Sequence, residues 1–182
     1  MNLPNFLSLV RIALVPLFFF LIILPIEYSL ARWWALFVYA LASLTDALDG
    51  YLARRWKQVT IFGETVDPLA DKLLVLSGMI ALHLTPQPVF VPPLWVTGLI
   101  ILREMVFAGG LITFVVLKKK MPSSPNFLGK STTLFQMVFV LSCLMNLYFS
   151  IYISFTTAAL TIASGFVYTL RGARYLAKGD NI

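Results

Sequence analysis

The sequence predicts an all-α integral membrane protein, built as a bundle of six transmembrane helices in a single domain over residues 1–182. Hydrophobic residues make up 59% of the chain and charged residues only 12%, which excludes disorder and favours a polytopic membrane protein. The length is that of one domain. The formal charge of +6 suits loops that face anionic lipid, so we expect membrane lipids as partners and no nucleic acid.

The first helix is expected over residues 12–25, after an interfacial segment at residues 4–11. No cluster of positive charge precedes the apolar run and no small-residue cleavage site follows it, so we interpret it as a retained helix and not as a signal peptide. The polar residues of the interfacial segment, Asn5, Ser8 and Arg11, recur on one helical face. From the residues alone, helix capping and a snorkelling arginine explain this pattern best.

The second and third helices are expected at residues 33–53 and 68–84, and four aspartates lie where they approach each other. Asp46 and Asp49 are three residues apart near the end of the second helix, while Asp67 and Asp71 are four apart at the start of the third. On helices each pair shares one face, and aspartates at a helix start also gain from the macrodipole. A hairpin of these two helices therefore predicts a cage of four carboxylates.

Such a cage suits Mg²⁺ or Mn²⁺, which prefer hard oxygen ligands. Four carboxylates can hold one ion, or two ions about 3.5–4 Å apart as in phosphoryl-transfer sites. The small residues Gly50, Ala53 and Gly63 leave room for a nucleotide, and Arg54 can meet phosphate with its planar guanidinium. The alternative is a surface hairpin whose charges only cap helices and mark the membrane boundary.

The fourth helix is expected at residues 94–117, with Arg103 and Glu104 near its middle. A charge at this depth costs about 2.5–3.5 kcal/mol, so each side chain should face a partner or a wet cavity. Because adjacent residues do not share a helical face, we expect Arg103 to point into the active cavity and Glu104 to orient a basic partner. A structural pair between the two residues is the alternative.

The fifth and sixth helices are expected at residues 132–149 and 151–170, separated by a short apolar divider. Lys130 follows Gly129 at the start of the fifth helix, where it can reach the same aqueous mouth. With six helices, both termini share one side of the membrane. That side receives nearly all the basic loop residues: Arg54, Arg55, Lys57, Lys118, Lys119, Lys120, Lys130, Arg171, Arg174 and Lys178. The positive-inside rule therefore places both termini and the aspartate hairpin in the cytoplasm.

The hairpin also carries a recognisable signature. The pattern Asp46-x-x-Asp49-Gly50-x-x-Ala53-Arg54, then eight residues, then Gly63-x-x-x-Asp67-x-x-x-Asp71 resembles the complete signature of the CDP-alcohol phosphatidyltransferase family. The interfacial segment is similar to the PN-x-x-T-x-x-R element of that family, with Ser8 in place of threonine. The resemblance implies a multi-pass enzyme of the bacterial cytoplasmic membrane, a homodimer with its active site facing the cytoplasm. It would move a phosphatidyl group from CDP-diacylglycerol to an alcohol and release CMP.

The resemblance assigns roles to individual residues. Asp46, Asp49, Asp67 and Asp71 would bind two divalent ions, and Asp71 would be the general base that takes the proton of the acceptor hydroxyl. The residues that would bind the CDP group are Asn5, Ser8, Asp46, Asp49, Gly50, Ala53, Arg54, Gly63 and Asp67.

The surrounding phrases resemble those of family members that use glycerol 3-phosphate as the acceptor: LPNFLSLVRI, TDALDGYLAR, FGETVDPLADKLLV, LRE and NFLGKSTTLFQM. The acceptor phosphate would then be bound by Arg103, Lys130, Arg171 and Arg174. The usual GK-x-K-T element lacks its second lysine here, which leaves serine or inositol phosphate as alternative acceptors.

Two other classes of membrane protein also use acidic residues. A prenyltransferase binds Mg²⁺ on a diphosphate, but such enzymes resemble bundles of about nine spans, which at about 20 residues a span would consume the whole chain. A divalent-cation transporter is expected to place its site at the bilayer midplane between broken helices, and not on a cytoplasmic hairpin with arginines.

Overall fold

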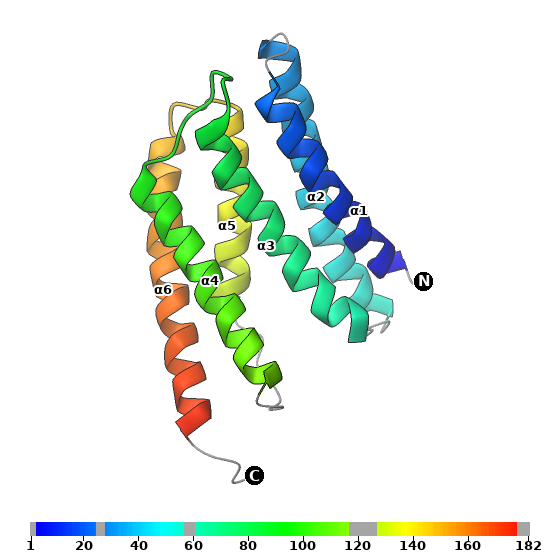
Figure 1. The fold of residues 1–182 in the computed structure, drawn as a ribbon, viewed down its shortest axis with the longest axis vertical. Coiled ribbons are helices and arrows are strands. Elements are labelled where there is room, and N and C mark those ends of the chain that lie inside the picture. Colours follow the sequence, from blue (N-terminus) through cyan, green and yellow to red (C-terminus); the bar gives the residue numbers. More distant parts are fainter. Residues whose placement is uncertain (1–2, 25–27, 57–60, 117–126, 178–182) are drawn as a thin grey trace. The chain divides into compact units, whose positions relative to one another are not determined.

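The computed structural model contains six helices and no strand in the part of the chain that it describes (Figure 1). The helices are α1 (Leu3–Ile23), α2 (Tyr28–Trp56), α3 (Ile61–Leu84), α4 (Leu94–Val116), α5 (Phe127–Leu144) and α6 (Ser150–Ala177). The structure describes residues 3–24, 28–56, 61–116 and 127–177, and within them it leaves out the side chains of residues 3–8, 28–29, 46–56, 61–69, 111–112, 114–116, 127 and 173–177. The prediction of six helices in an all-α fold is confirmed.

The chain divides into two compact units. The first unit comprises Met1–Pro92 and Met137–Ser150, and the second comprises Pro93–Gln136 and Ile151–Ile182. Helices α1, α2 and α3 therefore belong to the first unit, and α5 is divided between the units after Gln136. The single domain over residues 1–182 stays a prediction.

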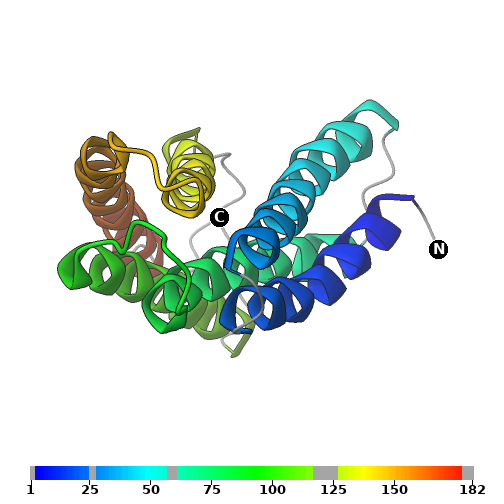
Figure 2. The same ribbon diagram turned by 90° about the horizontal axis from the view of Figure 1, so that it is seen from above.

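In the first unit, α1 contacts both α2 and α3, and α2 also contacts α3 (Figure 2). Phe18 of α1 and Tyr39 of α2 are fully buried, and their ring centroids are 5.0 Å apart. On α3, Gly78 lies directly against Tyr39, because a Cβ atom at position 78 would be only 2.9 Å from Tyr39 Cε2. The absence of a side chain at Gly78 thus lets α2 and α3 approach closely.

The start of the chain differs from the prediction. The interfacial segment and the first span form one continuous helix, α1, with Pro16 in its interior. A proline in a helix removes one backbone hydrogen bond, which is tolerated in membrane helices where neighbouring helices pack around it.

Helix α3 also starts earlier than predicted. Pro68 suggested a helix start, but α3 begins at Ile61 and contains Pro68 in its second turn. Asp71 consequently lies in the helix interior, ten residues after the first residue of α3. The stabilisation expected from the macrodipole is wrong for both Asp67 and Asp71, because that effect is confined to the first turn and Asp67 already lies six residues after Ile61.

The fifth helix ends five residues earlier than the predicted end at residue 149. Helix α5 ends at Leu144, and Asn146 adopts a left-handed backbone with a φ of 55°. The Asn146 N–H donates to the Cys143 carbonyl at 2.9 Å, and the Leu147 N–H donates to the Ser142 carbonyl at 3.1 Å. These two bonds form a Schellman end, for which asparagine is one of the few suitable residues besides glycine.

In the second unit, α4 and α6 run in the same direction (Figure 1) and contact each other through aromatic rings. Ring pairs join Trp95 to Phe155 at 5.9 Å and Phe107 to Tyr168 at 5.0 Å. The buried face of α6 carries hydroxyl side chains at helical spacing, namely Ser154, Thr157, Thr161 and Ser164. Two of these residues accept hydrogen bonds from other helices, because Thr161 Oγ1 accepts from Gln136 Nε2 of α5 at 3.3 Å and Ser164 Oγ accepts from Arg103 of α4 at 3.1 Å.

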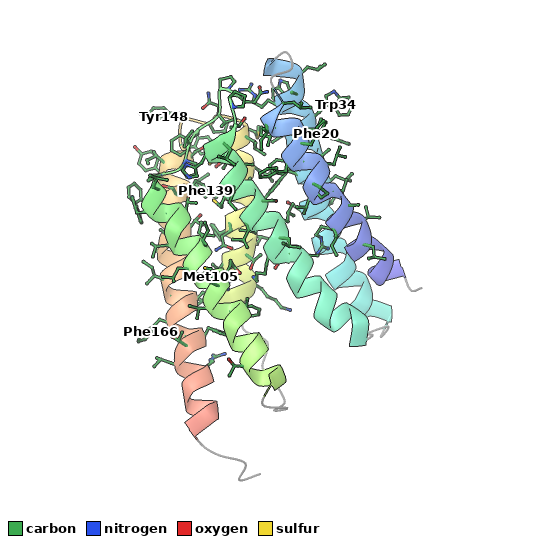
Figure 3. The ribbon with its side chains drawn as sticks, in the orientation of Figure 1. Phe20, Trp34, Met105, Phe139, Tyr148 and Phe166 are labelled. Atoms are coloured by element: carbon green, nitrogen blue, oxygen red, sulfur yellow. The ribbon has the colours of Figure 1, made fainter. Side chains whose placement is uncertain are left out.

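Within the described residues, one helical segment is long and apolar enough to cross a membrane, Ser150–Gly172. Shorter apolar segments are Leu9–Ile23, Leu30–Thr45 and Leu128–Leu144. Large apolar side chains are exposed on several helices, among them Phe20, Trp34, Met105 and Phe166, whereas Phe139 is buried (Figure 3). Such a surface suits contact with lipid. The six-span arrangement and the side on which the termini lie stay predictions.

Candidate active site

The register of α2 against α3 brings the aspartate positions to the same height. The two helices run in opposite directions (Figure 1) and meet at Tyr39 and Gly78. Both helices rise about 1.5 Å per residue, so equal steps from this contact stay level. Position 46 is seven residues after Tyr39 and position 71 is seven residues before Gly78, so these two positions are level. Positions 50 and 67 are level as well, because each is eleven residues from the same contact.

Helix α1 adds the predicted nucleotide-binding positions to the same layer. Thr85 Oγ1 donates to the Ile22 carbonyl at 2.6 Å, and Gln87 Nε2 donates to the Leu24 carbonyl at 3.2 Å. Both bonds lie at the ends of α1 and α3 and therefore align these two ends, and the two helices run in the same direction (Figure 1). Position 8 is fourteen residues before Ile22, and Asp71 is fourteen residues before Thr85, so position 8 of α1 is level with Asp71 of α3.

The backbone thus places the predicted metal-binding aspartates and the predicted CDP-binding residues on three contacting helices of one unit. Their side chains, other than that of Asp71, lie outside the described part: Asn5, Ser8, Asp46, Asp49, Gly50, Ala53, Arg54, Gly63 and Asp67. Among the side chains that are described, no three or more His, Cys, Asp or Glu residues form a metal-binding group. The four-carboxylate cage therefore stays a prediction, which the helix register favours.

Asp71 is half-buried, and its surroundings include residues that the sequence analysis did not select. Lys72 Nζ is 3.7 Å from Asp71 Oδ2. Tyr39 of α2 is fully buried, seven residues before the position that is level with Asp71. Lys72 was detectable as a single cation directly after an aspartate in an apolar run, whereas Tyr39 had no sequence signal.

Arg11 is fully buried, with none of its surface exposed. In the register of α1 and α3 it is level with Leu74, less than one turn from Asp71 along the helix. The interpretation of Arg11 as a snorkelling arginine is wrong, because a snorkelling side chain keeps its charged group in water. Arginine is almost never fully buried unless it is paired, and the height of Arg11 near Asp71 favours including it in the candidate site.

In the second unit, Arg103 and Glu104 form the direct pair that helical spacing argued against. Arg103 Nη1 is 2.5 Å from Glu104 Oε1, and Arg103 Nη2 donates to Ser164 Oγ of α6 at 3.1 Å. Both side chains are nearly inaccessible, 9% exposed for Arg103 and 1% for Glu104. The long arginine side chain bends along the helix to reach its neighbour, so Arg103 itself is a partner of Glu104.

The four predicted acceptor-binding cations lie at two different heights of the second unit. Arg103 is level with Ser164. Helix α5 is antiparallel to α6, and Thr132 Oγ1 donates to the Leu160 carbonyl while Gln136 Nε2 donates to Thr161 Oγ1. Counting from these two bonds places Lys130 level with residues 162–167 of α6, the height of Ser164 and therefore of Arg103.

Arg171 and Arg174 lie further along α6. They follow Ser164 by seven and ten residues, which is about 10 and 15 Å along a helix. Arg171 is exposed, and the side chain of Arg174 is outside the described part. An arginine side chain spans less than this distance, so Arg171 and Arg174, which lie nearer the helix end, are too far along α6 to share a phosphate with Arg103. If one phosphate binds at the height of Arg103, Lys130 is the better second cation.

Comparison with known proteins gives the same family that the signature suggested. A family model described as CDP-alcohol phosphatidyltransferase matches residues 1–168. The match includes all four aspartates of the hairpin, together with Arg103 and Lys130.

Three curated relatives illustrate the similarity. The chain is 34% identical over 189 residues to the CDP-diacylglycerol–glycerol-3-phosphate 3-phosphatidyltransferase of Bacillus subtilis (strain 168), covering 97% of this chain and 94% of that protein. It is 39% identical over 144 residues to the Rickettsia bellii protein of the same name, covering 79% and 75%. It is 40% identical over 137 residues to the cardiolipin synthase (CMP-forming) of Streptomyces coelicolor, covering 73% of this chain but 60% of that protein.

Proposed function

Because this chain belongs to the CDP-alcohol phosphatidyltransferase family, we propose that it transfers the phosphatidyl group of CDP-diacylglycerol to glycerol 3-phosphate. The products are phosphatidylglycerophosphate and CMP. The observation that carries the proposal is the family match over residues 1–168, which contains the complete aspartate signature. The names of the Bacillus and Rickettsia relatives support glycerol 3-phosphate as the acceptor.

The aspartate positions suit a divalent metal ion. Carboxylate oxygens are the ligands that Mg²⁺ and Mn²⁺ prefer, and the register of α2 and α3 brings four such positions to neighbouring heights. We propose that Asp46, Asp49, Asp67 and Asp71 bind two ions. When bound, the ions would neutralise the diphosphate of the donor and stabilise the charge on the departing CMP.

The chain's own residues then position and activate the two substrates. Gly50, Ala53 and Gly63 leave space for the cytidine and ribose, while Asn5, Ser8 and Arg54 bind the same CDP group. Asp71 takes the proton from the acceptor hydroxyl as its oxygen attacks the phosphorus that carries diacylglycerol. The bond between that phosphorus and the CMP oxygen breaks, and CMP leaves with the electron pair of that bond.

The phosphate of the acceptor needs cations that the donor does not occupy. Arg103 has five N–H donors, of which its described contacts with Glu104 and Ser164 use two, so the guanidinium can be held in place and still bind phosphate. Lys130 is at the same height of the second unit and is exposed. We assign the acceptor phosphate to Arg103 and Lys130 first, with Arg171 and Arg174 contributing at longer range.

The same proposal includes the setting of the enzyme. Six membrane spans with both termini in the cytoplasm place the basic loops on the inner face. That face of the bacterial cytoplasmic membrane is where glycerol 3-phosphate and the CTP-derived donor are available. A homodimer is proposed by family resemblance.

A second acceptor has an observation in its favour. The Streptomyces relative, at 40% identity, is named a CMP-forming cardiolipin synthase, and this chain lacks the second lysine of the GK-x-K-T element. A lipid acceptor, phosphatidylglycerol, would need fewer phosphate-binding cations than glycerol 3-phosphate, because its phosphate is a diester with one charge.

The test is an acceptor comparison with purified protein in mixed micelles that contain dioleoyl CDP-diacylglycerol and Mg²⁺. We expect glycerol 3-phosphate to stimulate CMP release more than phosphatidylglycerol, serine or inositol phosphate. Stimulation by phosphatidylglycerol alone would assign the cardiolipin-forming reaction, and stimulation by serine or inositol phosphate alone would assign those acceptors. No CMP release with any acceptor would contradict the transferase function.

A further inference from the structure

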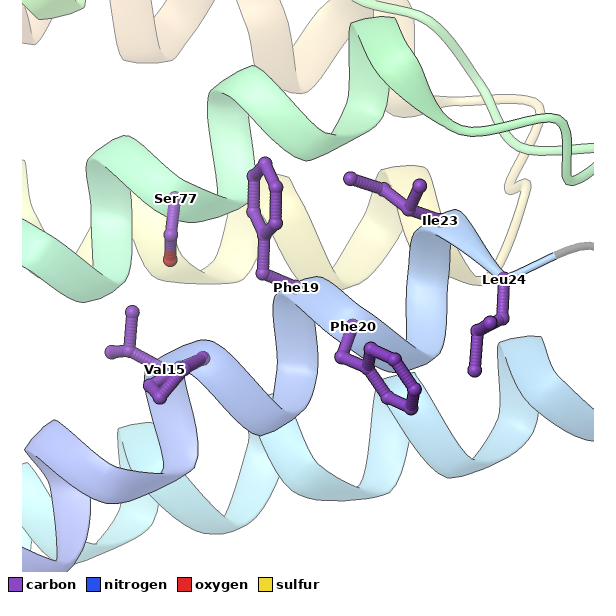
Figure 4. Close-up of a pocket in the computed structure, with 7 residues that line it drawn as sticks. Val15, Phe19, Phe20, Ile23, Leu24 and Ser77 are labelled. Carbon is purple, nitrogen blue, oxygen red and sulfur yellow. The ribbon is translucent and has the colours of Figure 1, made fainter.

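The first unit contains an apolar groove beside the candidate active site. Its volume is about 580 Å³, within the range of roughly 300–1,000 Å³ that ligand sites occupy. Figure 4 shows Val15, Phe19 and Ile23 on successive turns of α1, with Ser77 of α3 opposite them. The groove is lined by Val15, Pro16, Phe19, Phe20, Ile23, Leu24 and Ser77.

The lining selects an apolar occupant. Ser77 is the only polar residue of the lining, and its hydroxyl already donates to the Leu74 carbonyl of its own helix at 2.9 Å. A polar ligand would therefore find no free donor on these side chains and would be desolvated at a cost. A hydrocarbon chain would instead gain dispersion contacts with the aromatic and aliphatic walls.

The position and length of the groove suit one particular chain. Ser77 is six residues after Asp71 on α3, which places the near end of the groove about 9 Å beyond the level of Asp71. The α1 wall extends over the ten residues from Val15 to Leu24, which are nine steps of the helix or about 14 Å. The hydrocarbon of one leaflet is about 15 Å thick, half of a core of about 30 Å, so the distal part of an acyl chain that starts at the level of Asp71 extends past the near end of the groove.

We propose that this groove binds the distal part of one acyl chain of the CDP-diacylglycerol donor. The proposal rests on the proposed function, because it needs a lipid whose diphosphate is held at the height of Asp71. The walls of the groove are α1 and α3, which also carry Ser8 and Asp71 at that height, so a donor bound there extends its chain along the same two helices. The other substrate, glycerol 3-phosphate, has no chain to place in it.

The test fills the groove and compares donors of two lengths. Ser77→Phe and Val15→Phe place a ring in the near end, while Ala13→Phe adds a similar volume at an exposed position of α1 outside the lining. CMP release is measured with dioleoyl and with dihexanoyl CDP-diacylglycerol at saturating glycerol 3-phosphate. A hexanoyl chain is about a third of an oleoyl chain and so ends near the mouth of the groove.

We expect both groove variants to lower kcat/KM for the dioleoyl donor about tenfold, because a displaced chain also moves the reacting phosphorus out of place. Their kcat/KM for the dihexanoyl donor should stay within twofold of wild type, which also shows that they are folded. Ala13→Phe should change neither value by more than about twofold.

Three outcomes would overturn the proposal: equal loss on both donors, no loss on either, or the same selective loss in Ala13→Phe. A wild-type protein that releases no CMP from either donor would contradict the proposed function itself, which separates the two failures. As a direct readout of binding, a donor with a photoreactive diazirine at the end of one chain should label residues 15–24 of α1. Labelling distributed evenly over the exposed faces of all helices would assign the groove to bulk lipid.

Discussion

Tyr39 of α2 lies against Gly78 of α3 so closely that a methyl group at position 78 would be 2.9 Å from the tyrosine ring. The same methyl group would be 2.9 Å from Val140 Cγ1. This contact fixes the register of the two helices that carry the four aspartates. The height at which positions 46 and 71 are level therefore depends on Tyr39, seven residues before position 46, and on Gly78, seven residues after position 71.

Gly78→Ala should destabilise the protein and impair catalysis together. Overpacking a tight contact typically costs about 1–3 kcal/mol, and here the added methyl meets both a ring and a branched side chain of fully buried residues. We expect a lower unfolding midpoint in detergent and slower CMP release. Gly109→Ala is the matched control, since nothing lies within 4 Å of its Cβ position. Equal midpoints for the two variants would show that the contact does not hold the helices in register.

Tyr39→Phe should leave stability unchanged or raise it by up to about 1 kcal/mol. The Tyr39 hydroxyl is buried and makes no hydrogen bond to any described residue, and an unsatisfied buried polar group is costly. Ser164→Ala is the contrasting variant, because Ser164 Oγ accepts a bond from Arg103 at 3.1 Å and its loss should cost about 1–3 kcal/mol. Chemical denaturation of both variants measures the difference. Destabilisation by Tyr39→Phe of more than 1 kcal/mol would mean that the hydroxyl has a partner.

Asp71→Asn should lower CMP release by about 10²–10⁴-fold, the usual contribution of a general base. The amide has nearly the same shape as the carboxylate, so the unfolding midpoint should change little. Single-turnover rates at saturating donor and acceptor separate the chemical step from binding. A variant that keeps a tenth or more of the wild-type rate would remove Asp71 as the base.

The contribution of each cation of the second unit to acceptor binding should depend on its height along the helices. Lys130→Ala should raise the KM for glycerol 3-phosphate about tenfold, the loss of one charge-assisted contact, with little change in the KM for the donor. Arg171→Ala, further along α6, should change the acceptor KM by less than about threefold. Arg103→Lys is preferable to Arg103→Ala, because removing the positive charge would take away an ion pair of the buried Glu104 carboxylate. A larger effect from Arg171 than from Lys130 would contradict the height argument.

Divalent metal should stabilise the folded protein in a way that depends on the aspartates. At ten to a hundred times the dissociation constant, Mg²⁺ binding to the native state adds about 1.4–2.7 kcal/mol. We expect a higher unfolding midpoint with Mg²⁺ than with EDTA for the wild type, and none of this shift for Asp46→Asn or Asp67→Asn. A shift that persists in both variants would place the ion elsewhere.

The aspartates and the helices that carry them were predictable from the sequence because their signal is local. Spacing of three and four residues between carboxylates, and long apolar runs around them, require no knowledge of distant contacts. The helix ends were less predictable. Pro68 resembled a helix start although α3 continues through it, and the turn at Asn146 is surrounded by apolar residues that resemble a helix.

The environment of the candidate site depends on tertiary contacts, which single-sequence patterns do not contain. The burial of Arg11 follows from the packing of α1 on two neighbours, so its position near a membrane boundary wrongly suggested snorkelling. The pair of Arg103 and Glu104 requires a bent arginine side chain, which helical spacing alone does not consider. The height difference between Lys130 and Arg171 comes only from hydrogen bonds between α5 and α6.

The most direct measurement is the identity of the lipid formed. Purified protein is incubated with dioleoyl CDP-diacylglycerol, glycerol 3-phosphate and Mg²⁺, and the lipid extract is analysed by mass spectrometry, with Asp71→Asn in parallel. The wild type should form dioleoyl phosphatidylglycerophosphate in amounts equal to the CMP released, and the variant should form almost none. A different lipid product, or equal product from both proteins, would contradict the assignment of this reaction to the aspartate hairpin.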